Sequence, residues 1–415
     1  MSQSELDPRY RRGLSLSLRV SILLMVAAIL PLLIAVAGSE LFSRPALVTQ
    51  ANIAMKSDAQ SRVQLIDTYL SERLLDAETL TQVPSVISFM ATPPQLATQD
   101  QAVHASYSLV AGTFRDKHYT TWALFDPQGH LRLYYPATTL PSPRGQYLVP
   151  PDEVLEVKSG KPFISPVYYN PKTQKASLDL LSPIFTPPPK PTYLGFIHAT
   201  LNLDYIWNIV GGDLGANGNG SYAFILDQNK VRIADTVPSR RFTAIAPLPP
   251  QVQQSVTGQG QYGSTGNVPV LADSTLVSME QNNHPPETFQ MIPGGQSGMF
   301  QVTQRALKVV PWTYFVLSPV STVTAVADQQ LFNTIKIAFV VLLLAACTGL
   351  IMGQFITRPI MRSVERLRSN SEALNSLATT QQSAASEQTW VVDSSQVGLQ
   401  SVQYYTNATS IGARR

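Results

Sequence analysis

Two uncharged apolar runs constrain the fold of this chain more than any other feature. The first covers residues 20–38 and the second covers residues 337–356. A helix rises about 1.5 Å per residue, so each run is long enough to cross the roughly 30 Å hydrocarbon core of a membrane. About 300 residues lie between them and have the mixed composition of folded domains. We therefore expect two membrane spans with a large folded region between them.

Arginines flank both runs on the side away from the central region. They are Arg9, Arg11, Arg12 and Arg19 before the first run, and Arg358, Arg362, Arg366 and Arg368 after the second. Positive charge beside a span favours the cytoplasmic face, which predicts a protein of the plasma membrane with both termini in the cytoplasm and the central region outside. A cleaved signal peptide is the alternative for the first run, because Ala35-Val36-Ala37 fits a cleavage site. The length of the run favours an anchor.

A hairpin pattern occurs twice in the central region. Residues 119–136 and 221–238 each contain an apolar run, a polar turn that begins with an aspartate, and a second alternating run. This pattern is typical of a β-hairpin, and Gly129 and Asn229 are suited to positive φ in the two turns.

A second pattern is repeated in the same order. Residues 193–210 and 309–327 each predict a strand that leads into a helix. Two ordered pairs at similar separation indicate duplicated antiparallel sheet modules. The glycine-rich stretch at residues 211–220 marks the boundary between the modules.

Helical patterns occupy the region before the first hairpin. Residues 43–81 carry Val63, Ile66, Leu70 and Leu74 on one stripe, which predicts a long amphipathic helix that ends before Pro84. A second helix is expected at residues 101–117. The stripe is suited to packing on the chain's own sheets and to forming the seam of a dimer, and a helix of this length can do both.

The expected fold class is α+β, with a long N-terminal helix and two antiparallel-sheet modules between two spans. The predicted divisions are a cytoplasmic N-terminus at 1–19, a first span at 20–38, a helical stalk at 39–117, a membrane-distal module at 118–210, a membrane-proximal module at 211–330, a second span at 335–356 and a cytoplasmic helix at 357–415.

The last helix has a thin apolar repeat. Its seam positions are Ile360, Val364, Leu367, Leu374, Ala378, Ala385, Val392, Leu399 and Val402, interrupted by Ser371, Gln381, Gln388 and Ser395. Polar seam residues weaken packing, which suits a dimeric coiled coil that shifts between arrangements. A surface helix without a partner is the alternative.

These features together resemble bacterial transmembrane receptors with a double Cache sensor domain, which contains two PAS-like modules. The resemblance covers about residues 43–327, and residues 357–367, with Pro359 shortly after the span, look like the opening of a HAMP linker. It implies a homodimeric receptor that binds an extracellular small molecule and relays the signal through HAMP-like helices. A membrane-anchored adaptor without a small-molecule ligand is the alternative function.

The resemblance also implies a ligand site in the membrane-distal module. Its residues would be Arg144, Tyr147, Tyr168, Tyr169 and Asn170, where Gln146 replaces a family Trp and Asn170 replaces a common Asp. Arg144 would pair with a ligand carboxylate and the tyrosines would wall the pocket. Without the Asp an ammonium loses its counter-charge, which favours a carboxylate-bearing or neutral ligand over an amino acid. Alternatively, Arg144 is a surface-loop residue and the tyrosines are ordinary strand residues.

Other functions find little support in the residues. A net charge of +3 does not suggest nucleic acid as a partner, and the single cysteine, Cys347, allows no internal disulfide and no paired-cysteine metal site. HExxH, P-loop and GxSxG patterns are absent from the sequence, so we expect no enzyme, no cofactor and no metal site; an extracytoplasmic hydrolase is a distant third reading. No histidine follows the second run, so the output is expected from a further C-terminal segment or a separate signalling partner.

Overall fold

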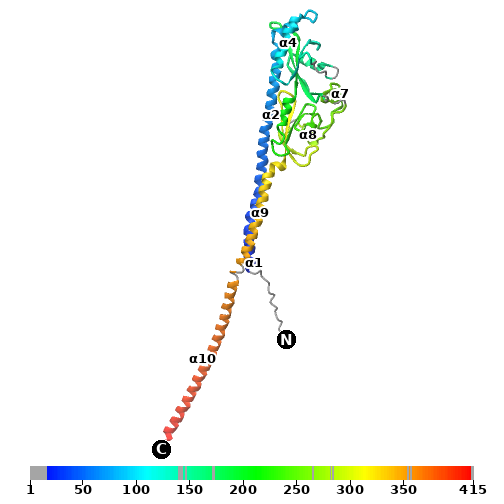
Figure 1. Ribbon diagram of the computed structural model, residues 1–415. Coiled ribbons are helices and arrows are strands. Elements are labelled where there is room, and N and C mark those ends of the chain that lie inside the picture. The colour runs from blue at the N-terminus through cyan, green and yellow to red at the C-terminus, as the bar shows by residue number, and fades with distance from the viewer. Residues whose placement is uncertain are drawn as a thin grey trace. The chain divides into compact units, whose positions relative to one another are not determined.

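The computed structural model describes residues 16–138, 144, 147–170, 173–263, 266–280, 282, 285–352, 355 and 358–412 (Figure 1). The contacts divide the chain into two units, with boundaries after Ser39 and after Gln329. Glu40–Gln329 contains both sheets. Arg9, Arg11, Arg12, Gln146 and Thr357, which the sequence predictions use, lie outside the described residues.

The first sheet contains the predicted hairpin and four further strands. Its strands are β1 (Tyr119–Phe125), β2 (Leu131–Tyr135), β3 (Phe163–Ile164), β4 (Tyr168–Asn170), β5 (Lys175–Phe185) and β6 (Tyr193–Asn202). They are antiparallel in the order β2-β1-β6-β5-β3, and β4 also pairs with β5. The first strand of the hairpin therefore lies beside the last strand of the module.

The second sheet repeats this arrangement. Its strands are β7 (Tyr222–Leu226), β8 (Arg232–Asp235), β9 (Thr288–Met291), β10 (Phe300–Ala306) and β11 (Thr313–Pro319), antiparallel in the order β8-β7-β11-β10-β9. Here too the hairpin begins beside the last strand. The shared strand order confirms the predicted duplication.

The two hairpin turns share their hydrogen bonds as well. In each, the side chain of Asp126 or Asp227 accepts backbone N–H bonds from the residues two and four positions later, at 2.8 to 3.0 Å. The residue three positions after the aspartate has positive φ, 84° at Gly129 and 62° at Lys230. The expectation that Asn229 takes this conformation is wrong, because the turn places the residue with positive φ one position later, at Lys230.

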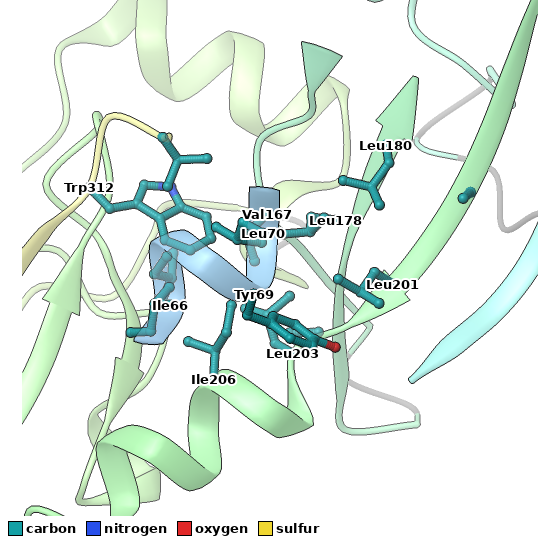
Figure 2. Close-up of a cluster of buried hydrophobic side chains, with 14 of the residues drawn as sticks. Ile66, Tyr69, Leu70, Val167, Leu178, Leu180, Leu201, Leu203, Ile206 and Trp312 are labelled. Atoms are coloured by element: carbon teal, nitrogen blue, oxygen red, sulfur yellow. The ribbon is translucent and has the colours of Figure 1, made fainter. Parts of the chain in front are cut away.

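The long helix α2 (Arg44–Thr81) packs across both modules and contacts β5, β6, β10 and β11. Its buried side chains include Val63, Ile66 and Leu70 from the predicted stripe. Figure 2 shows Ile66, Tyr69 and Leu70 of α2 among side chains of the first module and beside Trp312, which precedes β11. The stripe therefore packs on the chain's own sheets.

Shorter helices cap the sheets. They are α3 (Pro84–Ala91), α4 (Gln99–Thr113), α5 (Pro151–Lys158), α6 (Asp204–Gly211), η2 (Pro238–Arg240), α7 (Pro250–Gly258), η3 (Gln261–Gly263) and α8 (Ser274–Glu280). α2 ends before Pro84, as predicted, because proline suits the first turn of the next helix. The last three helices and β9 fall in residues 251–301, for which the sequence predicts no local structure.

Three long helices account for the rest of the described chain. α1 (Leu16–Gly38) leads through the π-helical turn η1 (Ser39–Ser43) into α2, α9 (Val320–Met352) directly follows β11, and α10 (Arg358–Gly412) comes last. Two helical stretches, Met25–Thr81 and Val320–Gly349, are long and apolar enough to cross a membrane. They contain most of the two predicted spans. Every side chain of α10 whose burial is described is exposed in the single chain.

Candidate functional site

The first sheet carries a buried charge cluster on the face opposite α2. We define the charge cluster as Arg144, Glu153, Tyr168, Asp179 and His198; all are buried except Tyr168, which is partly exposed. Asp179 lies on β5 and His198 on β6, Tyr168 lies on β4, Glu153 lies on α5, and Arg144 lies in the segment before α5. Five charged or titratable groups are thus gathered from segments far apart in the sequence.

The strand pleat explains why Asp179 and His198 share this face. Alternate residues point to opposite faces of a strand. Leu178 and Leu180 pack in the core that includes α2, whereas Leu181 packs in a separate small core with Val157 of α5. Asp179 therefore points with Leu181 to the α5 side. His198 pairs across the ladder with Leu181 and faces the same way.

Arg144 joins the two acids. Its Nη1 donates to Glu153 Oε1 at 2.5 Å, its Nη2 donates to Glu153 Oε2, and Nη2 lies 3.4 Å from Asp179 Oδ2. Its guanidinium also lies over the Tyr168 ring, 5.2 Å from the ring centroid. Two carboxylates therefore share one guanidinium that is 2 % exposed.

Asp179 is held by several further partners. Its Oδ1 accepts from the Tyr168 hydroxyl at 2.9 Å and from the Thr200 hydroxyl at 2.8 Å. His198 Nε2 lies 3.2 Å from Asp179 Oδ2. Burial by itself raises the pKa of Asp179, but His198 and Arg144 outweigh burial and hold the pKa at about 2. Asp179 is therefore ionised in the folded protein.

Glu153 is less well stabilised as an anion. Burial raises its pKa, and the hydrogen bonds from Arg144 oppose this rise only in part. Burial likewise lowers the pKa of Arg144, but Asp179 and Glu153 outweigh it, so the guanidinium stays charged. Of the two acids, Glu153 is thus the one whose ionised form its surroundings stabilise less, although it makes both hydrogen bonds to Arg144.

Two nitrogen atoms of the charge cluster have no hydrogen-bond partner. Arg144 Nε and His198 Nδ1 are buried without one in the part of the chain that the structure describes. Leaving a buried polar atom unpaired costs about 1–3 kcal/mol. Such atoms on one charged cluster favour a polar ligand that would satisfy them.

The same face of the second sheet is mostly apolar. There Phe224, Phe315 and Leu317 pack with Val302 and Leu276 in a continuous hydrophobic cluster. A buried pair, Arg232 and Asp235, lies at its edge, with Nη1 2.9 Å from Oδ2. The two copies therefore share a scaffold but differ in what fills this face.

The structure brings together only some of the residues that the sequence predicted for the ligand site. Arg144 and Tyr168 meet at Asp179, and the alternative that Arg144 is a surface-loop residue is wrong because its side chain is buried. Tyr147 forms a backbone bridge with Arg144, and its side chain is 44 % exposed. Tyr169 faces away and stacks on Phe242 of the second module. Whether these residues bind a ligand stays a prediction.

Asn170, the fifth predicted residue, is exposed at the end of β4. Its side-chain oxygen accepts from the backbone of Thr173 at 3.4 Å. The buried Asp179 instead provides a carboxylate beside Arg144, so the counter-charge for an ammonium is present in the module. The signal for Asp179 and His198 was one acid or histidine inside each of two largely apolar strands.

No group of three His, Cys, Asp or Glu side chains suited to a metal ion occurs among the described residues. The buried acids of the charge cluster are tied to Arg144 and to hydroxyl groups, and His198 lies beside Asp179.

No family model matches the chain, and no curated protein matches it by sequence. Among solved structures it is similar to the sensor domain of the Vibrio cholerae histidine kinase DctB, with 15 % identity, a TM-score of 0.50, and coverage of 67 % of this chain and 99 % of that one. The likeness shows that the central region has the fold of Cache-like sensor domains.

Two chemoreceptor domains give lower scores. The ligand-binding domain of the Pseudomonas aeruginosa PAO1 amino acid chemoreceptor PctC, in complex with GABA, has 12 % identity, a TM-score of 0.44, and coverage of 64 % of this chain and 98 % of that one. The ligand-binding domain of the Campylobacter jejuni chemoreceptor Tlp3, in complex with 4-methylisoleucine, has 13 % identity, a TM-score of 0.45, and coverage of 67 % and 94 %.

Proposed function

We propose that this chain is a transmembrane receptor whose first sheet module binds a small molecule outside the cytoplasm. The observation that carries the proposal is the charge cluster: ionised groups occupy the face of the first sheet where its duplicate has phenylalanine and leucine. Replacing buried ion pairs with apolar residues is often neutral or stabilising. Stability therefore does not explain the charges, whereas ligand recognition does.

The ligand class follows from the charges. A ligand carboxylate would take the place of Glu153 on the fork of Arg144, because a planar guanidinium binds one carboxylate through two parallel hydrogen bonds. An ammonium on the same ligand would find its partner in Asp179. We therefore propose a small carboxylate-bearing molecule, with Tyr168 beside it and Tyr147, Tyr169 and Asn170 on the surrounding strand and loop.

Displacement of Glu153 offers a route for the signal. Glu153 lies on α5, an eight-residue helix, and releasing it would free α5 from its main ionic tie to the sheet. A ligand shifts an equilibrium only if it binds two arrangements unequally. The ligand-bound arrangement is the one with Arg144 on the ligand, and the free arrangement is the one with Arg144 on Glu153.

The signal would leave through helices. We propose that residues 20–38 and 335–356 cross the plasma membrane with both termini in the cytoplasm, and that α10 acts as a HAMP-like helix in a homodimer. The length and apolar character of the two helical stretches support the spans. The exposed seam of α10, for example Leu374 at 66 %, supports a partner helix. A downstream signalling partner or a further output domain would receive the signal.

A thermal screen of the full chain in detergent micelles tests the ligand proposal. A ligand at about 100 times its Kd stabilises the protein by about 2.7 kcal/mol. We expect a small carboxylate to raise the Tm of the unmodified protein, and Arg144→Lys to lose most of this rise because lysine keeps the charge but not the fork. Arg115→Lys, at an arginine that pairs with Asp76 elsewhere, is the matched control.

The result that rejects the site is an unchanged ligand-induced rise in Arg144→Lys or Arg144→Ala. A screen in which no small molecule raises the Tm would instead favour an adaptor whose outer modules dock another protein.

Cysteine cross-linking in membranes tests the dimeric helix. In a Cys347→Ala background, Leu374→Cys on the seam should form an inter-chain disulfide, and Ser376→Cys, about 200° around the helix, should not. Equal cross-linking at the two positions would argue against a coiled coil in this register.

A further inference from the structure

A cavity of about 750 Å³ lies between the two modules and has no part in the charge cluster. From the first module, Tyr169 on β4 and Gln174 after it reach the cavity, and Trp207 reaches it from α6. The remaining described lining belongs to the second module: Pro238, Ser239, Arg241, Phe242, Tyr262, Gly263, Gly266, Asn267 and Pro269. Its volume is in the range of small-molecule sites.

Aromatic rings form the walls of this junction cavity. Tyr169 stacks on Phe242 with centroids 4.2 Å apart and planes 17° apart. The ring centroids of Trp207 and Tyr262 lie 6.3 Å and 6.4 Å, respectively, from the ring centroid of Phe242. Four rings around one space suit a flat aromatic guest, which stacks without loss of hydrogen bonds.

Arg241 forms no ion pair with any residue that the structure describes. Its guanidinium lies over the Trp207 ring, 4.1 Å from the centroid, and its Nε donates to the backbone oxygen of Asp235 at 3.3 Å. No Asp or Glu occurs among the described lining residues. Burial lowers the pKa of Arg241, because nearby acids compensate too little for lost water. An anionic guest would restore that balance.

Backbone strain gathers at the same cavity. The described residues contain four non-glycine residues with positive φ, and three of them line the cavity: Gln174 at 54°, Phe242 at 60° and Tyr262 at 54°. Positive φ is a true outlier for a bulky side chain and costs about 1–3 kcal/mol at each position. Such strain concentrates at ligand clamps, where the surrounding fold holds the residues in place.

We propose that the junction cavity is a second ligand site, which takes a planar aromatic carboxylate among the rings of the two modules with its carboxylate on Arg241. The Nη groups of Arg241 would hold the carboxylate in a fork. Tyr169 and Phe242 already stack on each other, so the ring of the guest would lie beside that stack and against Trp207. Because Tyr169 belongs to the first module and Arg241 to the second, occupancy would fasten the modules to each other. The proposal does not depend on the ligand of the charge cluster.

The test titrates the full chain in detergent micelles with benzoate, 4-hydroxybenzoate and indole-3-carboxylate by isothermal calorimetry. Trp207 fluorescence is followed in parallel, because the guest would contact that ring. We expect saturable binding of at least one of the three, with benzamide and cyclohexanecarboxylate at least tenfold weaker. These two compounds remove the charge and the flat ring, respectively.

Variants locate the binding. Arg241→Gln should weaken binding of the aromatic carboxylate at least tenfold, and Tyr169→Leu should weaken it while leaving Arg241 in place. Arg240→Gln is the matched control, because Arg240 lies over the Tyr222 ring and is not among the residues of the cavity. A Trp122→Phe protein should keep the fluorescence change, and Trp207→Phe should lose it.

Two results would overturn the proposal. One is the absence of saturable binding for all three aromatic carboxylates, and the other is equal binding by Arg241→Gln and the unmodified protein. Arg144→Lys separates this site from the first one: it should leave binding of the aromatic carboxylate unchanged, and a parallel loss in that variant would place the guest at the charge cluster instead.

Discussion

Replacing Arg144 with methionine removes the only guanidinium in the charge cluster and leaves two buried carboxylates behind. Asp179 keeps Tyr168, Thr200 and His198, so the main loss falls on Glu153, whose side chain is 4 % exposed and whose ionic partner is Arg144. Breaking a buried ion pair from one side costs about 3–5 kcal/mol. For a region of this size that corresponds to a decrease in Tm of roughly 6–20 °C.

The pH dependence of this loss follows from Glu153. Burial already raises its pKa, and removing Arg144 removes the group that opposes the rise. A carboxyl group with a raised pKa in the folded state contributes stability at pH values below its unfolded pKa and loses it as pH rises through the folded pKa. The stability deficit of Arg144→Met relative to the unmodified protein should therefore grow as pH rises above about 4.5, the ordinary pKa of a glutamate side chain.

The assay is urea unfolding of the full chain in detergent micelles, followed by the fluorescence of Trp122, Trp207 and Trp312. Arg115→Met is the control, since Arg115 pairs with Asp76 at 2.8 Å and its own side chain is 38 % exposed. Exposed pairs contribute about 0–1 kcal/mol. Adding Glu153→Gln to Arg144→Met should recover part of the loss. If Arg144→Met and Arg115→Met lower the free energy of unfolding equally, each by less than about 1 kcal/mol, the interpretation of Arg144 and Glu153 as a buried ion pair is refuted.

Three further changes test other parts of the fold by the same unfolding assay. Gly195→Ala should destabilise by more than about 2 kcal/mol, because φ is 128° and the added Cβ would lie 2.1 Å from the backbone oxygen of Phe125, whereas Gly258→Ala has nothing within 4 Å and should be close to neutral. Burial raises the pKa of Asp227 from 3.8 to about 6, so stability relative to Asp227→Asn should fall by about 3 kcal/mol as pH rises from 4 to 7; a pH-independent difference would contradict this. Asp67→Ala should cost about 1–3 kcal/mol, because its carboxylate accepts two backbone N–H groups before β11 at 3.0 to 3.1 Å, and no change would mean that water replaces it.

Local signals in the sequence were enough to predict both hairpins and the long helix α2, but not the helices and the strand between residues 250 and 291. Asp126 and Asp227 each open a turn whose hydrogen bonds close within five residues, so both hairpins could be predicted from short stretches. The stripe on α2 has helical spacing, and Pro84 sets where the next helix begins. The strand order was not predicted, because the first and last strands of each module pair across a long stretch of sequence.

The charge cluster could be predicted only in part, because its members meet through long-range pairing. Arg144 and Tyr168 were predicted from a family resemblance, but Glu153, Asp179 and His198 join them only once β5 and β6 are in register. A shift of one residue in that register would turn Asp179 to the α2 side. The junction cavity could not be predicted from the sequence, because two of its rings, Tyr169 and Phe242, belong to different modules.

Comparison of the two copies separates what stabilises the fold from what serves another purpose. In the second module, Phe224, Phe315 and Leu317 fill the face opposite α2, and burying each contributes about 1.5–3 kcal/mol. In the first module the corresponding face holds Asp179 and His198, which contribute little net stability because desolvation offsets their attraction to Arg144. The scaffold tolerates apolar side chains at the centre of this face, since the second copy has them there and keeps its own buried pair, Arg232 and Asp235, at the edge. The charges of the first copy therefore lower the stability of the first module, and a bound polar molecule would offset this loss. The second module has no comparable loss, so a ligand should stabilise the first module more.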